Sequence, residues 1–354
     1  MIEIDGSLGE GGGQILRTTL SLAICLGLNV RVYNIRAGRS RPGLMRQHLV
    51  CLRAAKEICG AQVTGDELGS TEISFVPGVV KAGRYHFAIG SAGSTTLVFQ
   101  TILIPLLLAN GMSEVYLEGG THNGMAPSFD FINHCFLPVI SSMGCRVEVA
   151  LEAYGFYPSG GGRWRVRIYP MVETMPMVLI DRGDIVSQYA VVTSANIPAH
   201  VGERELGHVK KRCLWSEASL IQRHVKSVGS GNILSLRVMS EALTEIFESV
   251  GEKNVRSERV AGRAVRDMMR YIKADVPVGE HLADQIILPM MFGGGRFRSL
   301  EPSQHLLTNM TLIEHLTGVN ISVVKLEKDR WEVNVPQLEG FGCLVGKNKI
   351  SFEF

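Results

Sequence analysis

A histidine stands at the start of a predicted helix in the segment Glu301–Asn309. Pro302 disfavours helical torsions in the residue before it, and Ser303 can cap the helix that follows. His305 then lies in the first turn, where backbone N–H groups are unpaired and the helix dipole is positive. Because this environment disfavours protonation of the ring, we expect His305 to be a neutral nucleophile near pH 7, beside N–H groups that attract phosphate. The alternative is a partly buried surface histidine.

A glycine-rich segment, Gly9–Gln14 (GEGGGQ), places one carboxylate immediately before another predicted helix. Consecutive glycines let the backbone approach a phosphate closely, and the helix N-terminus supplies N–H donors. Glu10 offers the oxygen ligands that a divalent cation requires. The segment lacks the closing Gly-Lys-Ser/Thr of a Walker A loop and is not a convincing dinucleotide fingerprint. Taken alone, it fits a flexible turn equally well.

A basic segment without acidic residues follows the second predicted strand. It contains Arg36, Arg39, Arg41 and Arg46, followed by Gln47 and His48. Guanidinium groups this close together repel one another unless an anion lies among them, and their planar fork suits phosphate. Arg17, on the first helix, can join them. We expect the cluster to bind phosphate groups or a nucleic-acid backbone, with a solvated run of charge as the alternative.

A third polar motif, Gly279–Gln285 (GEHLADQ), opens the predicted helix before the histidine segment. Asp284 and Gln285 lie near the start of that helix. Their spacing fits two interpretations equally, as helix caps or as contacts to a metal and a ligand.

Composition limits the classes of protein that the chain can be. Its 354 residues are enough for two domains, and its net charge of only +2 means that any nucleic-acid contact must come from local clustering. The seven cysteines are odd in number and form no C-x-x-C pair, which argues for a reducing compartment and against a zinc site or disulfide framework. The N-terminal segment is polar by Asp5, and the apolar run Leu97–Leu108 is too short to span a bilayer. We expect a soluble cytoplasmic protein without a membrane partner.

The elements that must position these residues repeat along the chain. The first unit consists of a strand, a glycine loop, a helix, a strand, a basic loop, a helix and two strands: Ile2–Asp5, Gly6–Gly13, a helix to about Leu26, Leu28–Ile35, Leu44–Cys59, and strands to about Val76. The second starts at Phe87–Ser91 and continues with Thr95–Asn110, Glu114–Glu118, Phe129–Met143, Arg146–Glu152 and Gly162–Ile168. The third starts at Val278-Gly279 and continues with Glu280–Phe292, Arg296–Leu300, the His305 helix, Asn320–Lys325 and Trp331–Val335.

Three β-α-β-α-β-β units predict an α/β fold with helices against sheets and internal pseudo-symmetry. A proline precedes the second helix of each unit, at Pro42, Pro127 and Pro302, although β-α alternation by itself is common to α/β proteins. Corresponding loops should gather on one side and line one cleft. These loops are the ones at Gly6, Gly90, Gly279, Arg36–Pro42, Gly119–Pro127 and Glu301–Ser303.

A segment between the second and third units does not fit the period and reads as a small α/β domain with its own core. It contains the strand Val186–Asn196, the helix Val201–Trp215, the strands Ser219–Lys226, Asn232–Met239 and Leu243–Ser249, and the helix Ser257–Tyr271. We therefore expect residues 1–179 and 274–354 to form a large three-repeat catalytic domain, and residues 180–273 to form the inserted domain.

These motifs, in this order and over essentially the whole chain, resemble the RNA 3′-terminal phosphate cyclases. The resemblance rests on Asp5-Gly6 with Gly9–Arg17, Ile35–Arg39, Pro42–Leu44 with Gln47–Leu49, Gly90–Ser94, Gly155–Pro158 with Gly160–Gly162, and the His305 segment. It implies a large domain of three repeated units, related in fold to the enolpyruvyl transferases, with a smaller inserted α/β domain.

The resemblance also implies a reaction. In that family a histidine attacks the α-phosphate of ATP, releases pyrophosphate and carries AMP, which then moves to an RNA 3′-phosphate. The neighbouring 2′-hydroxyl displaces AMP and leaves a 2′,3′-cyclic phosphate. His305 matches the nucleophile, Glu10 the carboxylate that binds a divalent cation (Mg or Mn), and Arg17 and Arg36 the basic residues of the phosphate pocket.

Further positions are assigned by the same resemblance. Gln100, Pro127 and Asp284 match positions near the family's bound nucleotide, and His281 and Gln285, from the same motif as Asp284, are expected at the nucleotide site with them. His281 departs from the family, where many members have a tyrosine that stacks on adenine. The clustering of basic residues, rather than the resemblance, makes one segment the expected RNA phosphate site: Arg39, Arg41, Arg46, Gln47 and His48.

The expected partner is an RNA 3′-phosphate end, and a homodimer is left open. Two other classes of protein remain as alternatives. A non-catalytic, cyclase-like branch assists ribosome assembly but lacks the nucleophile, and the enolpyruvyl transferases have six repeats. The tail Gly340–Phe354 is longer than the family core requires.

Overall fold

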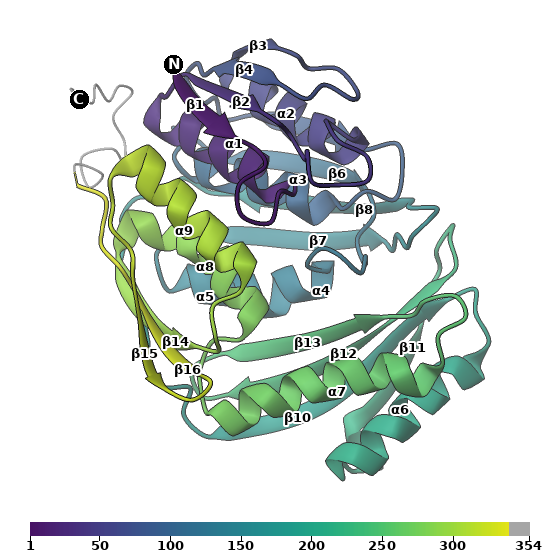
Figure 1. Cartoon of the computed structure of the whole chain (residues 1–354). Coiled ribbons are helices and arrows are strands. Elements are labelled where there is room, and N and C mark those ends of the chain that lie inside the picture. The colour runs from purple at the N-terminus through teal and green to yellow at the C-terminus, as the bar shows by residue number, and fades with distance from the viewer. Residues whose placement is uncertain (340–354) are drawn as a thin grey trace.

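Three similar α/β units make up most of the chain in the computed structural model, which describes residues 1–339; the tail Gly340–Phe354 lies outside the described residues (Figure 1). The first unit contains β1 (Ile2–Asp5), α1 (Gln14–Leu26), β2 (Val30–Tyr33), α2 (Arg46–Cys59), β3 (Gln62–Thr64) and β4 (Ile73–Val76). The second contains β5 (Arg84–Ala88), α3 (Thr95–Leu107), β6 (Ser113–Gly119), the consecutive helical segments α4 (Phe129–Phe131), η1 (Ile132–Phe136) and α5 (Leu137–Ser141), and β7 (Val147–Ala153) and β8 (Gly162–Ile168). The third contains β9 (Met177–Leu179), α8 (Glu280–Gly293), β14 (Gly295–Ser299), α9 (Gln304–Thr317), β15 (Ser322–Glu327) and β16 (Arg330–Val335).

Each unit builds a four-stranded sheet with the same strand order. The orders are β1-β2-β4-β3, β5-β6-β8-β7 and, written in the same direction, β9-β14-β16-β15. In every sheet the first two strands pair in parallel and the remaining pairs are antiparallel. A parallel pair needs a crossover connection, and the first helix of each unit lies in that connection. The predicted three-repeat α/β fold is confirmed.

The start of the third unit differs from the prediction. We expected it at Val278-Gly279, after the inserted segment. Instead its first strand is β9, which pairs in parallel with β14, so the insertion follows the first strand of the unit and interrupts it. Val278 forms only a single parallel bridge, to Ser299. Three residues carry too little hydrophobic periodicity to be recognised as a strand from sequence.

The inserted segment forms a fourth sheet with its own apolar core. Its elements are β10 (Ile185–Ala195), α6 (Ala199–Cys213), the short 3-10 helix η2 (Glu217–Ser219), β11 (Leu220–His224), β12 (Gly231–Ser240), β13 (Thr244–Val250) and α7 (Ser257–Ala274). The strand order is β11-β10-β12-β13, and both long helices contact the sheet. Val209, Leu234, Met268 and Tyr271 belong to a core cluster separate from that of the three units.

The helices of the three units lie together between their sheets, as Figure 1 shows for α1, α3, α8 and α9. Twelve of the thirteen residues of α1, and twelve of those of α3, are buried, as expected for helices that are enclosed on all sides. The first helix of each unit packs on the second helical segment of the unit before it: α3 on α2, α8 on η1 and α5, and α1 on α9. This cyclic packing brings the first and third units together at α1 and α9.

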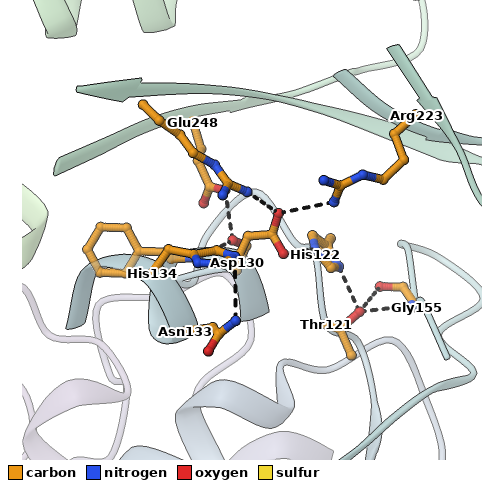
Figure 2. Close-up of polar contacts among 11 residues, drawn as sticks. Thr121, His122, Asp130, Asn133, His134, Gly155, Arg223 and Glu248 are labelled. Carbon is orange, nitrogen blue, oxygen red and sulfur yellow. Dashed lines mark hydrogen bonds and ion pairs between the residues drawn. The ribbon is translucent and has the colours of Figure 1, made fainter. Parts of the chain in front are cut away.

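A buried polar network joins the inserted sheet to the second unit (Figure 2). Asp130 Oδ2 accepts a hydrogen bond from Arg237 Nη2 at 2.7 Å and lies 3.7 Å from Arg223 Nη1. Burial opposes the charge on Asp130, but the nearby His122, whose Nε2 lies 3.8 Å from Oδ1, and the positive Arg237 outweigh it and lower the pKa of Asp130 to about 2. Ser128 Oγ donates to Glu248 Oε1 at 2.7 Å. The inserted sheet is therefore fixed on the second unit by directional contacts as well as by apolar ones.

In the described part of the chain, no helix combines the length and apolarity needed to cross a bilayer.

Candidate functional site

The N-terminus of α9 has the predicted form. Ser303 Oγ accepts a hydrogen bond from the backbone N–H of Leu306 at 3.1 Å, which caps the helix. Leu306, Met310 and Ile313 are buried against the core. His305 is the second residue of the helix and keeps 47% of its side chain exposed. The apolar stripe therefore anchors α9, and the histidine ring stands at its accessible end.

The ring of His305 faces the glycine loop and the start of α1. Nδ1 lies 2.6 Å from Gln14 Oε1 and 3.2 Å from Glu10 Oε2, and Gln14 Nε2 donates to the backbone oxygen of His305 at 3.3 Å. The second ring nitrogen, Nε2, makes no hydrogen bond to any described residue. A group that approaches His305 therefore meets an unoccupied Nε2.

The expectation that the helix start keeps His305 neutral is wrong in direction. The hydrogen bond to Glu10 raises the pKa of His305 above its usual range, and this effect exceeds the opposing effect of burial. A carboxylate at hydrogen-bond distance stabilises the imidazolium, and this outweighs the opposing effects of burial and of the charge on Arg17. The sequence could not show this, because Glu10 lies at the other end of the chain.

Glu10 is shared between two cationic partners. Its Oε2 lies 3.1 Å from Arg39 Nη2 as well as 3.2 Å from His305 Nδ1, and 12% of the side chain is exposed. Burial alone would raise the pKa of Glu10, but the interactions with His305, Arg39 and Arg17 lower it. A Cβ atom on Gly12 would collide with the Glu10 carboxylate, so the glycine is needed for this close approach. Glu10 is therefore an ionised carboxylate held in place by the loop.

The donor set fits a magnesium-type ion. Among residues 1–339 no group of three or more histidine, cysteine, aspartate or glutamate side chains could hold a metal. Mg²⁺ commonly keeps several waters and binds one or two carboxylates together with substrate phosphates. One ionised carboxylate, Glu10, near the guanidinium groups of Arg39 and Arg17 matches that pattern.

Arg17 and His48 lie behind the glycine loop. The guanidinium of Arg17 makes no hydrogen bond or ion pair with a described residue, although the charges of Glu10 and Asp284 act on it. Burial, together with the charges of Arg17 and Arg36, lowers the pKa of His48 to about 3, so its ring is neutral. His48 Nδ1 is buried without a partner. These unused donors and charges make the region attractive to an anion.

The basic segment is only partly gathered at this point. Arg39 contacts Glu10, whereas Arg36 Nη1 donates to the backbone oxygens of Arg41 and Gly43, at 2.6 and 2.9 Å. Arg41 is exposed, and its side chain makes no hydrogen bond or ion pair with a described residue. Arg46 Nη1 donates to the oxygen of Gly90 at 3.1 Å, and Gln47 Oε1 accepts from the N–H of Ser94 at 2.6 Å. Arg46 and Gln47 therefore connect α2 to the loop before α3.

The predicted nucleotide residues lie on α3, α8 and the loop before α4. Gln100 Nε2 donates to Gln285 Oε1 at 2.7 Å, and Gln285 Nε2 donates to the oxygen of His281 at 2.9 Å. The oxygen of Pro127 accepts from Thr96 Oγ1 at 2.7 Å. The ring of His281 is exposed. Hydrogen bonds thus connect Gln100 to Gln285 and Gln285 to His281. Pro127 is hydrogen-bonded to α3 one turn before Gln100.

Asp284 is not a helix cap, nor is Gln285. α8 begins at Glu280 after Gly279, and no side chain caps it. Asp284 Oδ1 is buried without a hydrogen bond, and burial raises the pKa of this carboxyl to about 7, despite the opposing effects of His305 and Arg17. The cap interpretation of these two residues is therefore wrong.

The predicted cluster of loops is divided between two contacts. The loop that begins at Gly6 meets the Arg36–Pro42 loop and the first turn of α9 through Glu10, which contacts Arg39 and His305. The N–H of Gly279 instead donates to Glu245 Oε2, on the inserted sheet, at 2.7 Å. The sequence indicated Gln14 only as the last residue of the glycine motif. Its contact with His305 makes it part of the site.

Comparison with known proteins gives consistent matches. The family model described as RNA 3′-terminal phosphate cyclase matches residues 8–323. A protein of Salmonella typhimurium strain LT2 named RNA 3′-terminal phosphate cyclase is 45% identical over 323 residues, which is 91% of this chain and 95% of that protein. A protein of Koribacter versatilis strain Ellin345 with the same name is 44% identical over 329 residues, 92% of this chain and 93% of that protein.

Proposed function

We propose, from the premise that this chain belongs to the RNA 3′-terminal phosphate cyclase family, that His305 carries AMP during the reaction. The chain is an enzyme of that family, whose members use ATP to convert an RNA 3′-terminal phosphate into a cyclic phosphate. The finer steps, and the residues that perform them, are our proposal. Its main support is the free Nε2 of His305, beside an ionised carboxylate and the unpaired guanidinium of Arg17.

In the first step, His305 Nε2 attacks the α-phosphorus of ATP. A nitrogen–phosphorus bond forms, the bond to the bridging oxygen breaks, and pyrophosphate leaves with the electron pair of that bond. The attack requires the neutral ring, because an imidazolium has no lone pair. Since Glu10 raises the pKa of His305, the ring must release its proton before it reacts. Covalent catalysis divides one difficult displacement into easier ones.

Glu10 is the residue that would hold a divalent cation, Mg²⁺ or Mn²⁺. When bound, the cation supplies positive charge to the phosphate oxygens during transfer. Arg17 and Arg36 then stabilise the phosphates from the protein side, because a guanidinium binds two phosphate oxygens in its plane. The nucleotide lies against Gln100, Pro127, His281, Asp284 and Gln285, of which the first and last are already hydrogen-bonded to each other.

In the later steps, AMP moves from His305 to the RNA 3′-phosphate, which forms a phosphoanhydride. The terminal 2′-hydroxyl then attacks the phosphorus of the RNA 3′-phosphate, loses its proton, and releases AMP to leave the 2′,3′-cyclic phosphate. Arg39, Arg41, Arg46, Gln47 and His48 are the proposed contacts to RNA phosphates. Among these His48 acts as a neutral group, because its pKa is about 3. The non-catalytic alternative lacks the nucleophile, and the free Nε2 of His305 speaks against it.

The test is covalent labelling with ATP that carries ³²P at the α-phosphate, in the presence of Mg²⁺. His305→Ala should lose the label and keep its fold, because α9 needs only its cap and apolar stripe, and alanine favours helix. The matched control is His315→Ala, since His315 is an exposed histidine in the last turn of the same helix. His315→Ala should label as the wild type does. Label retained by His305→Ala would exclude His305 as the nucleophile.

A further inference from the structure

Gln14 directs both polar atoms of its side chain at one residue. It is the first residue of α1 and only 8% exposed. Its Oε1 lies 2.6 Å from His305 Nδ1, and its Nε2 donates to the backbone oxygen of His305 at 3.3 Å. Two contacts to the same residue, one to the ring and one to the backbone, restrict the orientation of the ring relative to its own main chain.

These two contacts also determine where the ring proton lies. A backbone oxygen can only accept, so the amide NH₂ of Gln14 must face it, and the amide oxygen must face Nδ1. An amide oxygen is likewise only an acceptor, so Nδ1 must carry the hydrogen. In a neutral imidazole the other nitrogen then has the lone pair. The hydrogen-bond pattern therefore selects the tautomer in which Nε2 is the nucleophilic atom.

Glu10 is the other acceptor near Nδ1, but it has additional partners. Its Oε2 is farther from Nδ1, at 3.2 Å, and is shared with Arg39. Under the proposed function Glu10 also binds a cation, which competes for the same oxygen atoms. Gln14 is neutral and its side chain makes no hydrogen bond to any other described residue, so its contact with Nδ1 persists when Glu10 is engaged elsewhere.

We propose that Gln14 is a positioning residue that fixes the Nδ1–H tautomer and the ring orientation of His305, so that Nε2 faces the α-phosphate of ATP. This inference rests on the proposed role of His305. A second link one helical turn further on, from Thr18 Oγ1 to Asn309 Oδ1 at 2.8 Å, joins the same two helices without contacting the ring. Helix docking and ring positioning can therefore be separated experimentally.

The experiment compares Gln14→Leu with Thr18→Val in the full-length enzyme with Mg²⁺. Gln14→Leu keeps an apolar side chain of similar length but has no acceptor, whereas Thr18→Val removes the hydrogen bond between the helices. The measurements are the rate of covalent AMP formation at saturating ATP, the Kd for ATP, and the side-chain ¹⁵N signals of the histidines. The His305 signals are assigned by their absence from His305→Ala.

Gln14→Leu should slow AMP formation by roughly 10- to 100-fold, because the nucleophile is misplaced, while the Kd for ATP changes little. Its His305 signals should lose the Nδ1–H pattern. Thr18→Val should retain the wild-type rate and pattern, and Gln14→Glu, which keeps an acceptor oxygen, should recover the Nδ1–H pattern.

A folded Gln14→Leu variant with the wild-type rate and tautomer would overturn the inference. If Gln14→Leu does not fold, Gln14→Asn replaces it, because the amide of asparagine is one methylene too short to make both contacts. A wild-type rate and tautomer in Gln14→Asn would likewise overturn the inference. Failure of the proposal that His305 is the nucleophile can be distinguished from failure of the Gln14 inference. In the first case His305→Ala still becomes labelled, independently of the result for Gln14.

Discussion

Replacing Glu205 by glutamine should make the inserted domain less sensitive to rising pH. Glu205 lies on α6 and is 1% exposed; its Oε1 accepts from Asn232 Nδ2 at 2.7 Å, and its Oε2 is buried without a partner. Burial raises the pKa of this carboxyl from 4.5 to about 7, despite the hydrogen bond from Asn232. The folded state therefore binds the proton more tightly than the unfolded chain does. Its stabilising contribution is complete below pH 4.5 and is lost as the pH rises through 7.

The magnitude follows from the size of the rise in pKa. A change from 4.5 to about 7 corresponds to about 3 kcal/mol. Glutamine has no proton to lose, so the difference in stability between Glu205→Gln and the wild type should shift by about 3 kcal/mol in favour of the variant between pH 4.5 and pH 8. The unpaired amide of glutamine costs about 1–3 kcal/mol, but this penalty is the same at both pH values. The test is therefore the change of this stability difference with pH, and not whether the variant is more or less stable than the wild type at one pH.

Hydrogen exchange detected by mass spectrometry can measure this shift locally. Peptides from α6 and β12 report the free energy of opening of the inserted domain, and wild type and variant are compared at the same pH. Glu203→Gln is the matched control, because Glu203 is exposed on the same helix and its surroundings change little on unfolding. A stability difference that is equal at pH 4.5 and pH 8 would refute the assignment of a buried, protonatable Glu205.

Three further results are expected. Arg36→Ala should slow the reaction of 3′-phosphorylated RNA because the anion is no longer held in line, and an unchanged rate at saturating RNA would place Arg36 outside the site. Asp130→Asn should lower the stability measured by urea unfolding by about 3–5 kcal/mol because it leaves Arg237 buried beside a neutral group, and a change below about 1 kcal/mol would contradict this. RNA should react only with both a 3′-phosphate and a free 2′-hydroxyl, and should stall as the adenylylated RNA when the hydroxyl is missing. Comparison of 3′-phosphate, 3′-hydroxyl and 2′-deoxy-3′-phosphate ends tests this, and reaction of the plain 3′-hydroxyl end would favour a ligase.

The sequence predicts an element of the fold correctly where the element is long and its apolar pattern is regular. The helix of residues 304–317 follows from its capping residue and its apolar stripe, and the strand Gly162–Ile168 follows from the alternation of apolar and polar residues. The strand β9 was missed because three residues have no measurable period. The predicted helix Phe129–Met143 contains a π-helical segment, η1, which packs against α8 and β13. Tertiary contacts of this kind have no counterpart in a local pattern.

For the site, the sequence indicated which residue types could do chemistry but not how they pair. His305 was recognised from its helix start, and Glu10 from its glycine loop. The direction of the His305 pKa was wrong because the dominant influence is a carboxylate from the other end of the chain. Gln14 carried no signal beyond its place in the glycine motif, since a glutamine acquires a role only through the atoms that it faces.

The three-unit packing explains why chemistry is expected at one place only. Each first helix packs on the second helical segment of the preceding unit, so three junctions are equivalent in position. The second residue of that second segment is Gln47, Asp130 or His305. Gln47 accepts from the N–H of Ser94, which precedes α3, and thereby closes its junction. Asp130 is bound by Arg237 from the inserted sheet, which also satisfies the N–H of Gly279 through Glu245. Only at the α1–α9 junction does this position hold a nucleophilic side chain with a free ring nitrogen, beside a glycine loop that carries a carboxylate. The repeated architecture therefore supplies three similar helix starts, and under the proposed function the side chain at one position decides which of them binds a phosphate covalently.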